Sequence, residues 1–283
     1  MALPLHATTG ERIWHYTFLT ICVLIFGFLI IPILIIFPLS FNAQPYFTFT
    51  PEMLSFSPEG FSTKWYEKFF TDVNWQDSVK NSIIIAVFST IISTFLGTLA
   101  ALGLSRSDFP YKTAIMGILI SPMVVPLIIS AAGMFFFYSR IGLQGSFVGV
   151  ILAHAALATP FVVIVVTATL TGFDHSLTRA AASLGSSPTR TFFQITVPLI
   201  TPGVISGALF AFITSFDEVV VVLFVGSVKQ RTIPWSMFSG IREEISPTIL
   251  AVATLLIIMS ILLLTAIELL RRRNERLRGM SAA

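Results

Sequence analysis

Charged residues and cysteine are both scarce in this sequence. Only 11% of its 283 residues are charged, 55% are hydrophobic, and the mean hydropathy is +0.88. This composition excludes a soluble globular domain of ordinary type. The single cysteine, Cys22, excludes a disulfide framework within the chain and a metal–thiolate cluster. We therefore expect an integral membrane protein, in which the formal net charge of +3 informs orientation rather than nucleic-acid binding.

The sequence also lacks the motifs of common catalytic and nucleotide-binding sites. No G-x-x-x-x-G-K-[ST] segment occurs, so the chain has no P-loop for ATP hydrolysis, and we expect it to hold no cofactor. His6, His15, His154 and His175 lack metal-ligand spacing, and no serine and histidine form a convincing hydrolase pair. We expect neither a catalytic residue nor a metal site. His154 lies inside an apolar run, where we expect a hydrogen-bonded packing residue.

Long apolar runs with few or no charged residues, by contrast, dominate the chain. Six of them reach the roughly 20 residues that a helix needs to cross the hydrocarbon core; they lie near residues 17–41, 82–104, 114–138, 147–171, 203–225 and 248–270. The first is too long for the apolar part of a signal peptide and is interpreted as an uncleaved span. An exposed segment, residues 42–79, follows it. The pattern predicts an all-α integral membrane protein in which residues 1–283 form one domain of six spanning helices.

The basic residues of the connecting segments predict the orientation. With the N-terminus inside, the inner segments contain ten Lys and Arg against four Asp and Glu, and the outer segments contain seven of each. Basic residues are enriched on the cytoplasmic side of membrane proteins. We therefore expect both termini in the cytoplasm, together with residues 174–202, which connect the fourth and fifth runs.

Small residues and prolines mark the interior of several runs. Small residues recur at every fourth position in the second and fifth runs, at Ser89, Ser93, Gly97 and Ala101 and at Gly203, Gly207, Ala211 and Ser215. Such stripes let helix backbones approach closely. Pro122, Pro126 and Pro160 predict kinks or local unwinding in the third and fourth runs. Packing is the favoured explanation, and broken helices beside a substrate path are the alternative.

Residues 174–202 form a polar segment with two predicted helices. The spacing of one helix face is found in Leu177, Ala180, Ala181 and Leu184. Asp174 or Ser176 is available as the N-cap, and Gly185 is placed to end this helix in the left-handed conformation. A face of small residues suits docking of another protein. A capped connector without a partner is the alternative.

A second helix is predicted to follow directly. Ser187 is placed as its N-cap and Pro188 as its first residue. We expect Val197 and Pro198 to end it, and Pro202 to open the fifth span.

At this point the sequence resembles a known family. The string LTRAAASLGSSPTRTFFQITVPLITPG, residues 177–203, resembles the EAA cytoplasmic loop of binding-protein-dependent ABC importer permeases. Ala180 and Ala181 match the two alanines of that motif, Gly185 its glycine and Pro198 its closing proline, whereas Arg179 stands where an acidic residue is usual. Further stretches, SFDEVVVVLFVG and RTIPWSMFSGIREEISPTILAVATLL, are similar to permeases of the spermidine/putrescine type.

The resemblance implies a fold, an assembly and a set of functional residues. The fold is that of a type I (MetI-like) importer permease with six spanning helices and a cytoplasmic coupling helix. The residues assigned to ATPase coupling are Arg179, Ala180, Ala181, Gly185 and Pro198. The implied partners are a second, related permease chain, two cytoplasmic ATPase subunits that bind ATP, and an external solute-binding protein.

Asp217 and Glu218 interrupt the apolar fifth run. Carboxylates at membrane depth are costly and usually face a bundle interior or a water-filled path. About 14 residues at 1.5 Å each place Asp217 roughly 21 Å along a helix that begins at Gly203, beyond the midplane toward the outside. We hypothesise that Asp217, and less directly Glu218, lines a substrate path and attracts a cation. The alternative is that these acids bond serine, threonine or backbone groups and join helices.

Together these features predict a permease subunit of an ATP-driven importer in the bacterial inner membrane, with a small cationic solute such as spermidine or putrescine as substrate. Three alternatives stay open. The substrate could be an amino-acid-like compound or a metal complex, because an external binding protein sets much of the specificity. The chain could be a secondary transporter, which would transport without ATP. A membrane-embedded enzyme would show turnover with the purified chain alone.

Overall fold

The computed structural model describes residues 8–105, 110–243 and 246–277 of a chain that is built from helices. In these ranges there is no β-strand, only an isolated bridge between Asn42 and Phe61. The elements are α1 (Thr9–Leu39), α2 (Pro51–Leu54), η1 (Pro58–Gly60), α3 (Lys64–Thr71), α4 (Val73–Leu104), α5 (Lys112–Val124), α6 (Leu127–Ile141), α7 (Phe147–Thr171), α8 (His175–Ser183), α9 (Pro188–Thr191), η2 (Phe192–Thr196), α10 (Val197–Phe216), α11 (Val220–Val225), η3 (Val228–Gln230), α12 (Ile233–Glu243) and α13 (Thr248–Leu277). An all-α architecture is confirmed.

The chain divides into two compact units, residues 1–72 with 240–283 and residues 73–239. Within the described residues, four helices are long and apolar enough to cross a membrane, namely α1, α4, α7 and the continuous helix from Pro188 to Phe216. α5 and α6 make a fifth crossing if they are counted as one broken span. In α13 the apolar stretch Thr248–Leu262 is shorter. The chain is thus a multi-pass membrane protein, and six spans in one domain stays a prediction.

In the first unit, α1 is a long helix whose side chains are mostly exposed until Leu39, its last residue, which is buried. Its first turn is stabilised by a capping box between Thr8 and Glu11. At its other end, the Trp65 Nε1–H of α3 donates to the Asn42 carbonyl at 2.6 Å, and the Tyr66 hydroxyl lies 2.6 Å from Ser40 Oγ. These bonds fasten the segment that contains α2 and α3 to the end of α1.

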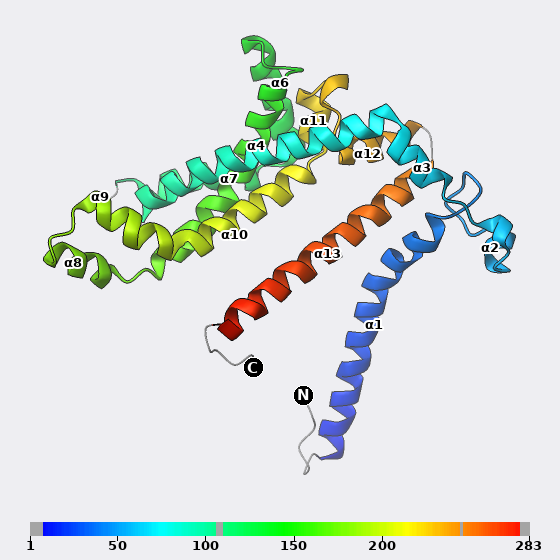
Figure 1. Ribbon diagram of the computed structural model, residues 1–283, viewed down its shortest axis with the longest axis horizontal. Coiled ribbons are helices and arrows are strands. Elements are labelled where there is room, and N and C mark those ends of the chain that lie inside the picture. Colours follow the sequence, from blue (N-terminus) through cyan, green and yellow to red (C-terminus); the bar gives the residue numbers. More distant parts are fainter. Residues whose placement is uncertain (1–7, 106–109, 244–245, 278–283) are drawn as a thin grey trace. The chain divides into compact units, whose positions relative to one another are not determined.

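In the second unit, α4, α7 and α10 run side by side (Figure 1). The two predicted small-residue stripes are buried along their full length on α4 and α10. A Cβ added at Gly97 would lie 2.7 Å from Val162 Cβ of α7, and one at Gly207 would lie 3.2 Å from Val162 Cα. Val162 is therefore held between two glycines, and the prediction that the stripes permit close helix packing is confirmed.

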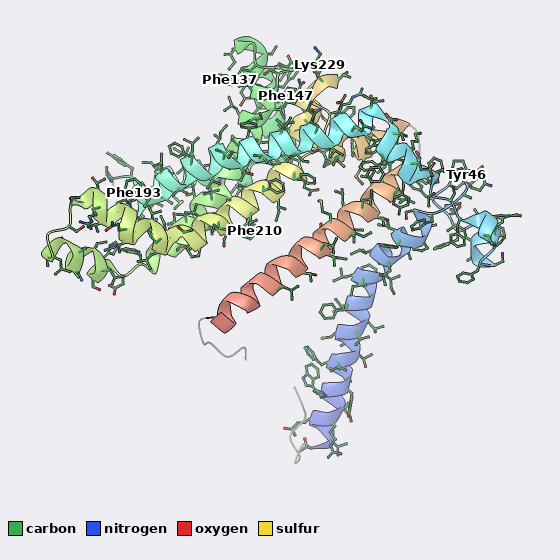
Figure 2. All side chains as sticks on the ribbon, in the orientation of Figure 1. Tyr46, Phe137, Phe147, Phe193, Phe210 and Lys229 are labelled. Atoms are coloured by element: carbon green, nitrogen blue, oxygen red, sulfur yellow. The ribbon has the colours of Figure 1, made fainter. Side chains whose placement is uncertain are left out.

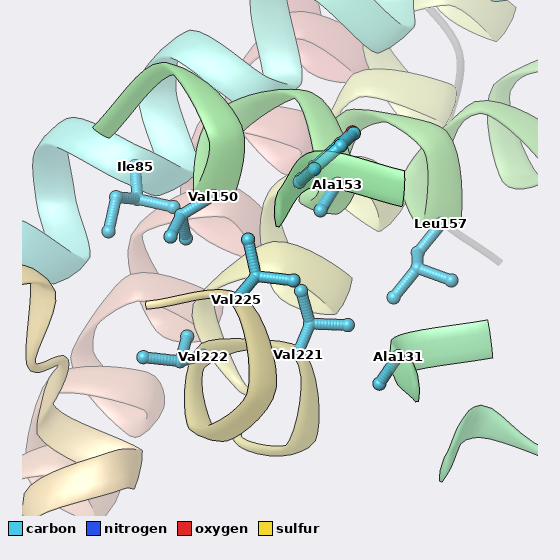
Figure 3. Packing of buried hydrophobic residues seen from close by; sticks show 9 residues of the cluster. Ile85, Ala131, Val150, Ala153, Leu157, Val221, Val222 and Val225 are labelled. Carbon is cyan, nitrogen blue, oxygen red and sulfur yellow. The ribbon is translucent and has the colours of Figure 1, made fainter. Parts of the chain in front are cut away.

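A second hydrophobic cluster surrounds the short helix α11. Val221, Val222 and Val225 pack against residues of α4, α6 and α7. Figure 3 shows the valines of α11 facing these neighbours. Because a six-residue helix has little intrinsic stability, burial of its valines is what keeps α11 in place.

Proline has different effects in the third and fourth runs. α5 and α6 are separated at Val125 and Pro126 and meet at an angle of 101°, so the predicted break in the third run is confirmed. α7 continues without interruption through Pro160, so local unwinding is wrong there and a kink at Pro160 stays a prediction. Pro160 is buried in the three-helix packing, where neighbouring helices support the backbone.

Candidate functional site

The first candidate site is the 174–202 segment, which begins with a well-capped helix. Asp174 is the N-cap of α8: its Oδ1 accepts the Ser176 N–H at 2.8 Å and its Oδ2 accepts the Ser176 hydroxyl at 2.7 Å. These hydrogen bonds, chiefly the one from the hydroxyl, lower the pKa of Asp174. The residue is fully exposed and remains a carboxylate near neutral pH, as an N-terminal cap requires.

Gly185 ends α8 as the sequence predicts. Its φ is +80°, in the left-handed region that favours glycine. The Gly185 N–H donates to the Ala182 carbonyl and the Ser186 N–H to the Ala181 carbonyl, both at 3.0 Å. This pair of bonds is a Schellman motif, and the glycine terminator is confirmed.

The next helix starts as predicted but does not end where it was expected to. Ser187 Oγ accepts the Arg190 N–H at 3.3 Å, and Pro188 occupies the first turn of α9. The prediction that Val197 and Pro198 stop this helix is wrong, because Pro188–Phe216 is one continuous helix. The π-helical turn η2 explains the continuity: the Val197 N–H reaches back five residues to the Phe192 carbonyl, which widens the backbone just before Pro198.

Most residues assigned to coupling are exposed. Arg179, Ala180, Gly185 and Pro198 are all accessible, whereas Ala181 is buried against the neighbouring turns. Leu184 is the C-cap rather than a helical residue and is 88% exposed. The predicted helix face therefore splits, with Ala181 packing inward and Ala180 and Leu184 facing outward.

This segment lies at one end of the α4, α7 and α10 helices (Figure 1). α8 contacts α9 and η2. Phe193 of η2 adds an apolar side chain at the same end and is also exposed (Figure 2). Small, apolar and basic side chains are thus presented together on a short capped helix and its neighbouring turn, an arrangement suited to docking.

The second candidate site is the break between α10 and α11, where the acidic pair lies. Asp217 is the C-cap of α10 and is exposed. Glu218 is buried, and its Oε1 accepts the Val221 N–H at 2.9 Å, which caps the start of α11. The expectation that both acids lie on a continuous helix is wrong, since the backbone leaves the helix at Asp217. The two side chains consequently have different surroundings.

A recess of about 490 Å³ opens at this break. It is lined by Leu127, Ile213, Thr214, Asp217, Glu218, Val219 and Val220. The carboxylate of Asp217 is the accessible charge in a mostly apolar lining, so the recess suits a cation attached to a hydrocarbon chain. No pattern in the sequence pointed to Leu127, which lines the recess because α6 begins directly after the break at Pro126.

His154 of α7 lies against the last turn of α10. Its Nδ1 is 3.1 Å from the Ser215 carbonyl oxygen and 2.9 Å from Ser215 Oγ, and the residue is 1% exposed. The prediction of a hydrogen-bonded packing histidine is confirmed.

Hydrogen bonds that the sequence did not predict join the start of α4 to the segment after α11. Asn81 Nδ2 donates to the Lys229 and Arg231 carbonyls, both at 2.9 Å, and Ser82 Oγ accepts the Ile233 N–H at 2.8 Å. Figure 2 labels Lys229, in the segment after α11. Polar residues near a helix end are common, and only their partners, about 150 positions away, reveal this role.

Among the described residues no cluster of three or more His, Cys, Asp or Glu could hold a metal ion. Arg106, Asp108, Glu244 and Arg278, which enter the charge count for orientation, lie outside the described residues.

Comparison with known proteins finds a family, close relatives and a similar solved structure. Residues 93–276 match the family described as binding-protein-dependent transport system inner membrane component. The chain is 33% identical over 251 residues to the spermidine/putrescine transport system permease protein PotC of Haemophilus influenzae, covering 89% of this chain and 95% of the relative. It is 31% identical over 246 residues to the putrescine transport system permease protein PotI of Escherichia coli K12, covering 84% and 85%.

The fold is also found in a solved structure. The crystal structure of a bacterial ABC transporter involved in the import of the acidic polysaccharide alginate includes a chain that superposes with a TM-score of 0.70 at 16% identity, covering 96% of this chain and 99% of that one. At this identity the likeness shows the fold alone.

Proposed function

This chain belongs to the family of binding-protein-dependent transport system inner membrane components, and on that premise we propose that it is the permease subunit of an ATP-driven importer of polyamines such as spermidine and putrescine. The observation that carries the substrate proposal is the 33% identity to a spermidine/putrescine permease along 89% of the chain. As a member of this family the chain is a transport subunit that works with other transporter components.

The recess at the break supports a cationic substrate. A polyamine combines ammonium groups with methylene chains, and the recess combines the exposed Asp217 carboxylate with apolar walls. A charge-assisted hydrogen bond to Asp217 would hold one ammonium group, while the neighbouring leucine, isoleucine and valine side chains contact methylenes. Glu218 acts less directly, because its carboxylate already accepts a backbone N–H of α11.

The exposed 174–202 segment supports coupling to a cytoplasmic ATPase. We assign the docking surface to Arg179, Ala180, Gly185 and Pro198, with Ala181 holding α8 against its neighbouring turns. Small side chains allow a partner to approach the helix backbone. Arg179 gives this surface a positive charge. We therefore propose that the ATPase residue facing Arg179 is acidic or neutral.

The proposed assembly contains this chain, a second related permease chain, two ATPase subunits and an external solute-binding protein. Both termini face the cytoplasm of a bacterial inner membrane. ATP binds to the ATPase subunits, and this chain takes no cofactor of its own. Closure of the ATPases on ATP displaces the 174–202 segment, and the helix that continues into α10 passes the displacement to the substrate path.

The test is uptake of labelled putrescine and spermidine by vesicles that contain the complete assembly co-purified with this chain. We expect uptake that requires ATP, the ATPase subunits and the solute-binding protein, and we expect that protein to carry a polyamine when it is isolated. An amino acid or a metal complex in its place would overturn the substrate proposal. Uptake without ATP would overturn the importer proposal.

A further inference from the structure

The break between α10 and α11 leaves a carbonyl group that a continuous helix would pair. In an α-helix the N–H of residue 219 donates to the carbonyl of residue 215. Here α10 ends at Phe216, where the Asp217 N–H still donates to the Ile213 carbonyl at 3.0 Å, and α11 begins only at Val220. Ser215 therefore lies in the last turn of α10, whose carbonyls have no helical donor. In an apolar interior such a group is costly to leave unpaired.

His154 supplies a donor at this position from a different helix. Its Nδ1 lies 3.1 Å from the Ser215 carbonyl oxygen, and the imidazole is buried. A carbonyl oxygen can only accept a hydrogen bond, so we assign the ring proton to Nδ1. Ser215 Oγ, 2.9 Å from the same nitrogen, shares the contact.

We propose that His154 is a positioning residue for the substrate path: its Nδ1–H takes the place of the Val219 N–H at the Ser215 carbonyl and thereby keeps the helix broken at the recess. The assignment goes beyond the proposed transport function and rests on it only where uptake is the readout. His154 is the buried histidine of α7, and the proposed binding of a cation by Asp217 assigns it no role.

The break is then held from both sides. On the α10 side His154 satisfies the Ser215 carbonyl, and on the α11 side the Glu218 carboxylate accepts the Val221 N–H at 2.9 Å. Without the histidine donor, we expect the Val219 N–H, which would pair with this carbonyl in a continuous helix, to bond it and extend α10 by a turn. Each added helical residue rotates by about 100°, so Glu218, Val219 and Val220, which line the recess directly after Asp217, would leave their places in it.

Two substitutions separate this role from simple packing. In His154→Asn the side-chain Nδ2 is as many bonds from Cα as the histidine Nδ1, so the donor is kept although the side chain is smaller. In His154→Leu the volume is largely kept but the donor is lost. A packing role predicts that the leucine variant is the milder one, whereas a donor role predicts that the asparagine variant is.

The first measurement is putrescine uptake by the complete assembly at equal amounts of inserted protein. We expect His154→Leu to raise the half-saturating concentration about tenfold, the equivalent of one net hydrogen bond, with the maximal rate little changed. We expect His154→Asn to stay within about twofold of the unsubstituted protein. The reverse order of the two variants would overturn the proposal.

The second measurement is hydrogen exchange of the backbone amides from Asp217 to Val221 in the complete assembly without polyamine. Extension of α10 in His154→Leu should slow exchange at Val219, whereas His154→Asn should exchange like the unsubstituted protein. Equal exchange in all three would overturn the proposal. If putrescine is not transported at all but this order of exchange is found, the substrate assignment fails and the positioning role stands.

Discussion

The 174–202 segment and the break at Asp217 are both interruptions of helices, but they are stabilised in different ways. α8 is capped by its own neighbours in sequence, Asp174 with Ser176 at the start and Gly185 with Ser186 at the end. The break is stabilised by groups that lie elsewhere, with His154 sixty-one positions from Ser215 and the α11 valines packed on α6 and α7. The first interruption is exposed and locally encoded, and the second depends on the packing of the whole unit.

The largest expected effect comes from the turn that ends α8. Gly185→Val places a β-branched residue at φ +80°, which valine avoids, so the Schellman turn should be lost and the orientation of α8 with it. We expect ATP-dependent uptake to fall to less than about one-tenth, with normal insertion. The check is uptake per inserted chain, together with co-purification of the ATPase.

Gly142→Val is the matched control for this prediction. Gly142 ends α6 at φ +72°, and like Gly185 it has no atom within 4 Å of an added Cβ. The two substitutions therefore introduce similar strain in different places. If both abolish uptake equally, the effect of Gly185→Val is general destabilisation and the special role of the α8 turn is lost.

A smaller effect is expected at the break. Asp217→Asn removes the exposed charge of the recess, and we expect the half-saturating concentration of putrescine to rise about tenfold as a charge-assisted contact is lost. Glu218→Gln keeps an oxygen that accepts the Val221 N–H and should change it by less than about threefold.

Asp77→Asn, on the exposed surface of α4, controls for loss of negative charge in general. Uptake kinetics of the three variants decide between two roles for the acidic pair. An unchanged half-saturating concentration in Asp217→Asn would remove Asp217 from the substrate path and would leave both acids with a structural role.

The smallest expected effect is the pH dependence of the α8 cap. Because hydrogen bonds from Ser176 lower the pKa of Asp174, its cap stabilises α8 above the ordinary carboxyl pKa and loses this contribution as pH falls through the lowered pKa. Exchange protection of the Ser176 and Leu177 amides should decrease over that acidic range. The cap of α9 uses the Ser187 hydroxyl, which does not titrate, so the Arg190 amide is an internal control. A parallel loss of protection at Arg190 would contradict the prediction.

The same contrast explains what the sequence predicts and what it does not. Gly185, Ser187 and Pro188 predicted their turns correctly, because caps depend on residues within a few positions. The burial of the serines, glycines and alanines of α4 and α10 could equally be predicted from their spacing.

The errors lie where distant groups decide the backbone. Pro198 was expected to end a helix, yet the π turn before it lets the helix continue. Asp217 was placed inside a helix, although the helix ends there, with the Ser215 carbonyl 3.1 Å from His154 Nδ1. The π turn is closed by a backbone bond between Val197 and Phe192 that no sequence motif announces, and the break at Asp217 depends on which helices pack against it.

The continuity of the helix from Pro188 to Phe216 has a mechanical consequence. Its 29 residues make a rod of about 43 Å, with the proposed docking segment at one end and the recess at the other. A rod turns a small tilt into a large displacement at its far end: roughly 10° of rotation about Pro188 moves Phe216 by about 7 Å, more than the pitch of one helical turn. The widened turn η2 (Phe192–Thr196) lies near the Pro188 end of this helix, so almost the whole length of the rod extends beyond it toward the recess.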